Sequence, residues 1–104
     1  MDESIRFLFE IVNNPHLFIG NDGLIALSHF MNGFITHQRL MNARTKEADE
    51  MHQSFSEYVH DKLNDRRTVS LYRCINDNTK TDDEAFALFY SLLHEFYDEK
   101  QQKA

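Results

Sequence analysis

The chain has little of the residues that bend or cross-link a backbone. Of its 104 residues, one is proline, three are glycine, one is cysteine and none is tryptophan. The proline and all the glycines fall between Pro15 and Gly33, so the sharply shaped backbone belongs to that segment, and the rest must form elements that need neither residue. Because Cys74 stands alone, an intramolecular disulfide is excluded.

Long uncharged runs and clusters of basic residues are also missing. No stretch approaches the roughly 18 to 20 uncharged residues of a membrane span. The chain carries 11 Lys and Arg against 17 Asp and Glu, a formal net charge of −6, and its longest basic run is Arg66-Arg67, which argues against nucleic acid as a partner. The acidic start Met1-Asp-Glu-Ser4 does not resemble a secretory signal, so we expect a cytoplasmic protein.

Apolar residues, by contrast, are plentiful. Hydrophobic residues make up 41% of the chain and include nine Phe and four Tyr, enough for one core. A chain of this length is too short for two independent cores, so we expect a single domain over residues 1–104, with fraying of the tail from about residue 98.

The apolar positions recur at helical spacing. They predict amphipathic helices over residues 3–13, 24–42, 46–64 and 81–100. Pro15 ends the first helix, Asp22 is placed to cap the second, and Thr81 with Glu84 forms a capping box that opens the last. Thr68 can cap a short helix over residues 69–76, although Val69, Leu71 and Tyr72 also fit a strand. The predicted fold class is all-α, a bundle of about five helices.

Gly33 lies inside the second predicted helix. An interior glycine costs about 0.5–1 kcal/mol relative to alanine, and close approach of another helix or ring is its usual justification. We therefore expect such an approach at Gly33, or else a kink or an early helix end there.

Six histidines raise the possibility of a metal site. Glu57 and His60 have the Glu-x-x-His spacing of di-iron bundles, but no second pair exists, so we expect His60 to face solvent beside an acidic residue. His94 begins a zinc-protease pattern in which Asp98 stands where the second histidine must be. The pairs His29 with His37 and His52 with His60 are two turns apart, too far for one metal. We predict no metal and no cofactor.

Catalytic patterns are equally sparse. Cys74 lies on an apolar stretch, where a buried thiol packed as a small hydrophobe is expected rather than a nucleophile. No arginine is followed five or six residues later by the histidine of small helical nucleases, and no phosphate-binding loop occurs. We predict that the protein is not an enzyme.

Two predicted helices carry outward acidic stripes. One stripe lies on the third helix and the other on the last: Glu47, Glu50, Ser54, Glu57 and Asp61, and Glu84, Ala87, Ser91, Glu95 and Asp98. Such a stripe is either a solvated helix face or a docking surface for a basic protein. For docking, we predict electrostatic contacts from Glu47, Glu50, Glu57 and Asp61, and aromatic anchors from Tyr58 and Tyr72.

Several segments together resemble a known family. They are Pro15-His-Leu-Phe-Ile-Gly20, then Leu24, Leu27, Phe30 and Gly33-Phe34, then Phe55-Ser-Glu-Tyr-Val59, and the closing stretch Asp83-Glu-Ala-Phe-Ala-Leu-Phe-Tyr-Ser-Leu-Leu-His-Glu-Phe96. The pattern resembles small bacterial immunity proteins encoded beside contact-dependent inhibition and other polymorphic toxins, and it covers most of the chain.

The resemblance implies a cytoplasmic antidote. Such a protein binds one toxin C-terminal domain as a monomer in a 1:1 complex and blocks its active site, with no turnover and no cofactor. Many of these toxins are basic RNases or DNases, whose phosphate substrate an acidic inhibitor would mimic. The alternative from a different class is a small helical adaptor or regulator that dimerises through the wide apolar face of the last helix, residues 84–97.

Overall fold

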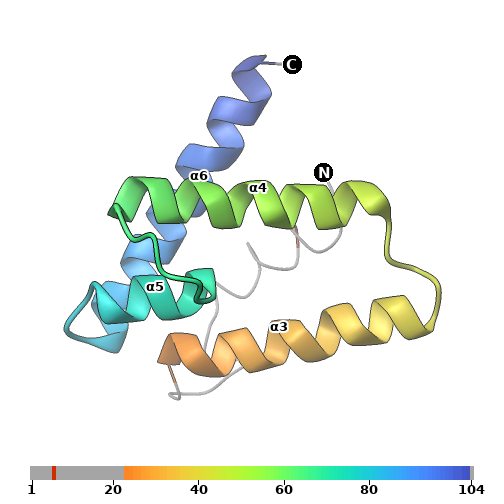
Figure 1. Ribbon diagram of the computed structural model, residues 1–104, viewed down its shortest axis with the longest axis horizontal. Helices are drawn as coiled ribbons and strands as arrows, with labels where there is room; N and C mark the ends of the chain where they lie inside the picture. The colour runs from red at the N-terminus through yellow and green to blue at the C-terminus, as the bar shows by residue number, and fades with distance from the viewer. Residues whose placement is uncertain (1–5, 7–22, 104) are drawn as a thin grey trace.

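Four helices make up the described part of the chain. The computed structural model describes Arg6 and residues 23–103, and in these residues it contains α3 (Gly23–Leu40), α4 (Lys46–Leu63), α5 (Leu71–Asp77) and α6 (Asp82–Lys103), with no strand (Figure 1). The all-α prediction is confirmed. The helix predicted over residues 3–13, its end at Pro15 and the cap at Asp22 lie outside the described residues, apart from Arg6.

The helices pack around α5 and α6. Figure 1 shows α3 and α4 running along two sides of the molecule, α5 at one end and α6 crossing behind α4. Helix α5 contacts α3, α4 and α6, and α6 in turn contacts α3 and α4. The core is built from Leu24, Leu27, Met31, Phe55, Val59, Leu71, Tyr72, Cys74, Ile75, Ala85, Phe89, Leu92, Leu93 and Phe96. Burying these side chains is the main source of stability for the bundle.

Asparagine, serine and threonine shape most of the connections. Asn42, two residues after α3, and Asn64, directly after α4, adopt positive φ at 56° and 51°, the left-handed conformation that ends many helices. Thr45 caps α4 by accepting a hydrogen bond from the Ala48 amide at 3.0 Å. Asparagine tolerates the left-handed region better than other non-glycine residues, which explains how a chain with so little glycine can turn sharply.

The short segment of uncertain type is a helix. Its N-cap is Ser70, whose hydroxyl accepts from the Arg73 amide at 3.2 Å, so the expected cap at Thr68 is wrong. The last helix begins with the predicted box, since Thr81 Oγ1 accepts from the Glu84 amide at 3.1 Å. The Glu84 carboxylate, however, accepts from the Lys80 amide at 3.0 Å rather than from that of Thr81. Helix α6 continues to Lys103, beyond the position near 98 where fraying was expected.

Two glycines fall in described residues and differ sharply. Gly33 is exposed, and a Cβ built on it would meet nothing within 4 Å among the described residues, so these residues do not provide the expected close approach. Helix α3 also continues past Gly33 to Leu40 without an early end. Gly23 opens α3 at φ +84°, and its Cβ would come within 2.8 Å of the Asp82 carboxylate. Of these two positions, Gly23 is the one whose backbone and surroundings require glycine. None of the helices in the described part of the chain is long and apolar enough to cross a membrane.

Candidate functional site: an acidic face on α4 and α6

The predicted acidic stripe lies on the outside of α4. Glu47, Glu50, Glu57 and Asp61 are all exposed. Two of the four carboxylates have basic neighbours, because Lys46 Nζ lies 3.7 Å from Glu50 and Arg66 Nη1 lies 2.7 Å from Asp61. These pairs join side chains that are more than 60% exposed, where an ion pair contributes little to stability. Exposed side chains held this weakly are free to exchange partners.

Tyr58 connects this stripe to α6. Its half-buried ring packs against Phe96, with 5.5 Å between ring centroids. Its hydroxyl lies 3.2 Å from a carboxylate oxygen of Glu95 and 3.4 Å from one of Glu99. Burial of the phenol, together with these two carboxylates, raises the pKa of Tyr58 to about 12. One hydroxyl hydrogen is thus shared by two negative groups, which leaves a strongly negative spot on this face.

The other predicted aromatic anchor is misplaced. Tyr72 is 4% exposed, and its ring stacks on Phe89 inside the core, with centroids 5.6 Å apart. It has no exposed part to offer a partner, so the prediction of Tyr72 as an anchor is wrong. The sequence did not determine whether residues 69–76 form a helix or a strand, and therefore did not determine which of their side chains face the core. In α5, Tyr72 is buried together with Leu71, Cys74 and Ile75.

A cavity lies where the two helices meet. This α4–α6 pocket has a volume of about 290 Å³ and is lined by Glu57, Tyr58 and Asp61 of α4 and by Phe96, Glu99 and Lys100 of α6. Three of these residues were predicted contacts. Glu99 and Lys100 were not predicted, and Phe96 was expected only as part of the apolar face of the last helix. The 3.6-residue period of α6 could have placed them near Phe96, but nothing local indicates that this end of α6 crosses α4.

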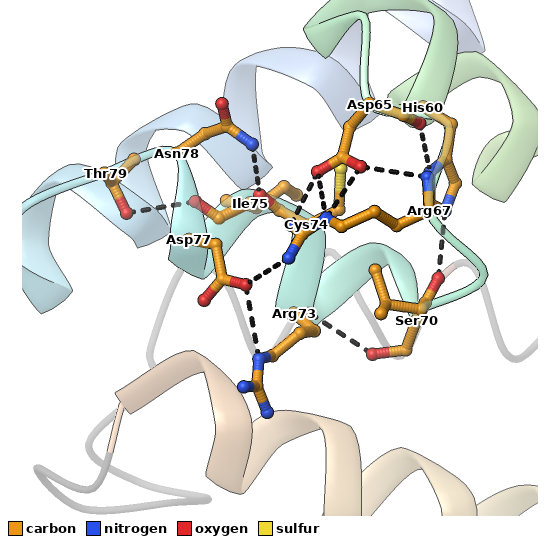
Figure 2. A network of polar contacts seen from close by, with 11 residues as sticks. His60, Asp65, Arg67, Ser70, Arg73, Cys74, Ile75, Asp77, Asn78 and Thr79 are labelled. Atoms are coloured by element: carbon orange, nitrogen blue, oxygen red, sulfur yellow. Dashed lines mark hydrogen bonds and ion pairs between the residues drawn. The ribbon is translucent and has the colours of Figure 1, made fainter.

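A second polar cluster closes the connection between α4 and α5 (Figure 2). The Arg67 guanidinium donates to both oxygens of Asp65, at 2.9 Å and 2.7 Å, and to Asp77 at 3.0 Å. These hydrogen bonds lower the pKa of Asp65 well below its usual range, and they also lower the pKa of Asp77. They also raise the pKa of Arg67. The cluster therefore fastens the loop to the last turn of α5.

His60 belongs to this cluster and does not face solvent as expected. Its ring is half-buried, with Nδ1 2.8 Å from the carbonyl oxygen of Asp65 and Nε2 3.0 Å from that of Val69. Since carbonyl oxygens only accept, the ring can donate to both only when both nitrogens carry hydrogen. His60 thus connects the end of α4 with the residues that lead into α5.

The same cluster brings together three groups of metal-ligating type. Ligand atoms of His60, Asp65 and Cys74 lie within 4.8 Å of one another. Each is already engaged: the Asp65 carboxylate accepts from Arg67 and from the Cys74 thiol, and the His60 nitrogens face carbonyl groups. A metal would have to displace the guanidinium and take the proton from Cys74. Burial and the Asp65 contact raise the pKa of that thiol to about 11. The residues fit a hydrogen-bonded corner better than a metal site.

A thiol, an imidazole and a carboxylate converge at Cys74, His60 and Asp65, but the thiol is not accessible to a substrate. Cys74 is fully buried, as predicted, and its raised pKa keeps the thiol protonated and unreactive. Among the other histidines, His29 and His37 are exposed on α3, while His52 is half-buried with its pKa lowered by burial and by the charge of Arg44.

A second cavity, of about 450 Å³, lies beside His60 and is lined by Arg66 and Arg67. Each arginine already forms an ion pair, Arg66 with Asp61 and Arg67 with Asp65.

Comparison with known proteins finds no matching family model, no similar curated protein and no similar solved structure. The immunity-protein resemblance therefore stays a prediction. Any function for this chain must be argued from its own residues.

Proposed function

We propose that this protein binds a basic protein domain through the acidic face formed by α4 and the adjoining end of α6, and that it acts as an immunity protein against a toxin. The observation that carries the proposal is the gathering of exposed carboxylates from two helices around one half-buried tyrosine. Glu57 and Asp61 of α4 line the same pocket as Glu99 of α6, and the Tyr58 hydroxyl lies within hydrogen-bonding distance of Glu95 and Glu99.

The charge of this face suits a partner that handles phosphate. A nuclease binds its substrate with clustered Lys and Arg, and an acidic inhibitor competes for those side chains. Complementary charge speeds association and disfavours partners of the wrong sign. The inhibitor would act by covering the toxin active site, one molecule for each toxin, and would need no cofactor of its own.

The adaptor alternative depends on an exposed apolar surface along α6. Of the large hydrophobic residues that are exposed in the described chain, Leu40 and Met41 follow one another at the end of α3 and only Tyr90 lies on α6. Phe89, Leu92, Leu93 and Phe96 are instead buried in the core. The balance of apolar and acidic surface on α6 therefore favours binding of a basic partner over dimerisation along residues 84–97.

The direct test is protection of bacterial cells. A toxin domain encoded by the gene directly upstream should kill or arrest cells when produced alone, and this protein should restore their growth. Purified together, the two should form a 1:1 complex. Absence of both protection and complex formation with that domain would contradict the immunity role.

Charge variants locate the interface. Glu50→Gln with Glu57→Gln should slow association with the basic domain by about tenfold at low salt, with a smaller effect at high salt because screening weakens steering. The matched control is Asn32→Lys with Thr36→Lys, which makes the same change in net charge on the exposed face of α3. If both pairs slow association equally, the effect comes from overall charge, and the interface is not on α4.

A further inference from the structure

The α4–α6 pocket combines aromatic rings with carboxylates. Tyr58 and Phe96 present rings inclined at 57° to each other, and Glu57, Asp61 and Glu99 contribute negative charge beside them. At about 290 Å³ the pocket lies just below the range of about 300–1,000 Å³ typical of small-molecule sites. Its size fits one side chain of a partner better than a cofactor.

The rings of this pocket already attract cations of the chain itself. Lys62 Nζ lies 5.4 Å from the centroid of the Tyr58 ring, and Lys100 Nζ lies 5.6 Å from that of Phe96. Both distances are within the roughly 6 Å over which an ammonium group is attracted to an aromatic face. Both lysines are exposed, so each is held weakly and can be displaced. These two contacts show that an ammonium group can reach both rings.

We propose that the α4–α6 pocket receives an arginine side chain of the basic partner. A guanidinium is planar, so it can stack on the half-buried ring of Tyr58 while donating two parallel hydrogen bonds to a carboxylate of Glu57 or Glu99. An ammonium group cannot do both, since it is a compact and strongly hydrated point charge. Arginine is therefore able to displace Lys100, which the chain holds over the same pocket. This inference deepens the proposed function and names the contact through which that function would be exerted.

The pocket can be tested without the partner. The probe is N-acetyl-arginine amide, titrated at millimolar concentration while the aromatic signals of Tyr58 and Phe96 are followed by NMR. We expect saturable shifts at both rings. Binding should weaken at least fivefold in Glu57→Gln with Glu99→Gln, whose exposed side chains leave the core unchanged. N-acetyl-lysine amide should bind several-fold more weakly than the arginine probe, and equal binding would overturn the assignment to arginine.

A second variant separates the pocket from general electrostatics. Lys100→Gln removes the internal competitor and should tighten binding of the arginine probe about two- to fourfold. The matched control is Lys46→Gln, which makes the same change in charge. Lys46 lies about 18 Å from Tyr58 along α4, given a rise of about 1.5 Å per residue. If both variants tighten binding equally, or if shifts appear without saturation, the acidic surface attracts arginine only diffusely and the pocket is no binding site.

The two proposals fail in different ways. If the probe binds in the pocket but the protein does not bind the basic domain encoded by the upstream gene, the arginine site is supported and the immunity role is contradicted. If the basic domain binds and its association depends on Glu50 and Glu57, but Glu99→Gln and Lys100→Gln leave both the probe and the domain unaffected, the acidic face stands and the arginine pocket is wrong.

Discussion

The hydroxyl of Tyr58 and the carboxylate of Glu95, 37 residues apart in the chain, lie 3.2 Å apart across the contact between α4 and α6. This hydrogen bond lies at the edge of the α4–α6 pocket, and Tyr58 also lines that pocket. The same contact thus orders the helix crossing and positions an aromatic ring for a partner. Its strength depends on pH, since the phenol must keep its hydrogen.

Replacing Tyr58 by phenylalanine tests the contribution of this hydrogen bond to stability. Tyr58→Phe keeps the ring and removes the hydroxyl, so the free energy of unfolding should fall by about 1 kcal/mol at pH 7, the usual net value of one hydrogen bond. The pKa of this phenol is raised from about 10 to about 12 on folding. Its contribution is therefore complete below pH 10 and is lost as pH rises through 12, so the difference between the two proteins should shrink over that range.

Urea denaturation at pH 7, 10 and 11 measures the effect. Tyr90→Phe is the control, because Tyr90 is an exposed tyrosine on α6, the helix that carries Glu95 and Glu99. A difference between wild type and Tyr58→Phe that stays constant up to pH 11 would show that the hydroxyl contributes through something other than these hydrogen bonds.

The Arg67 cluster should give the protein a dependence on acid. Hydrogen bonds from Arg67 lower the pKa of Asp65 and Asp77, so the stability they contribute is present above about pH 4 and is lost as pH falls through the lowered values. Arg67→Gln removes both contacts. We expect its melting temperature to lie several degrees below that of wild type at pH 7, with the two values converging toward pH 2.

Arg66→Gln is the matched control for this experiment. Arg66 is adjacent in sequence and bonds to Asp61, but both side chains are about 70% exposed, at 73% and 67%. Its loss should change the melting temperature by less than 1 or 2 degrees at any pH, since exposed pairs contribute about 0–1 kcal/mol. Equal effects of the two variants would mean that burial at the α4–α5 connection does not strengthen the Arg67 contacts.

Periodicity predicted the long helices because the pattern that specifies them is local. The expected helix over 46–64 is α4 at Lys46–Leu63, since Phe55 and Val59 fall on one face in any amphipathic arrangement. The seven-residue α5 was not predictable in the same way. Leu71 and Tyr72 fit a strand as well, and the segment becomes a helix when Ser70 caps it and its apolar residues contact α3, α4 and α6 at once.

The candidate site likewise has one part that the local sequence predicts and another that depends on contacts between helices. Glu57, Tyr58 and Asp61 lie within five residues, so their shared location followed from the sequence. Glu99 and Phe96 join them only because α6 crosses α4 at this end, where Phe55 packs against Phe96 with ring centroids 5.3 Å apart. Side-chain spacing within one helix carries no information about which neighbour that helix meets.

Tyr72 offers a prediction of opposite sign to Tyr58. Its hydroxyl is buried and has no hydrogen-bond partner among the residues that the structure describes, and burial raises its pKa. Leaving a buried hydroxyl unpaired costs about 1–3 kcal/mol, so Tyr72→Phe should stabilise the protein by about 1 kcal/mol while keeping the stack on Phe89. Urea denaturation at pH 7 measures this gain. Destabilisation would mean that the hydroxyl has a partner. Partner binding should not change, because the residue is inside the core.

The two described glycines predict opposite outcomes for one substitution. Gly33→Ala should raise the free energy of unfolding by about 0.5–1 kcal/mol, because the new methyl group meets no described residue within 4 Å and alanine loses less backbone entropy in a helix. Gly23→Ala should lower it by more than about 1 kcal/mol, because φ is +84° and the methyl group would lie 2.8 Å from Asp82 Oδ1.

Combining this second change with Asp82→Ala separates the two causes. The double variant should recover only the part of the loss that comes from the clash, while the cost of the left-handed backbone remains. Full recovery would assign the whole effect to the carboxylate contact, and Gly23 would then be required for the approach of α6 rather than for its own conformation.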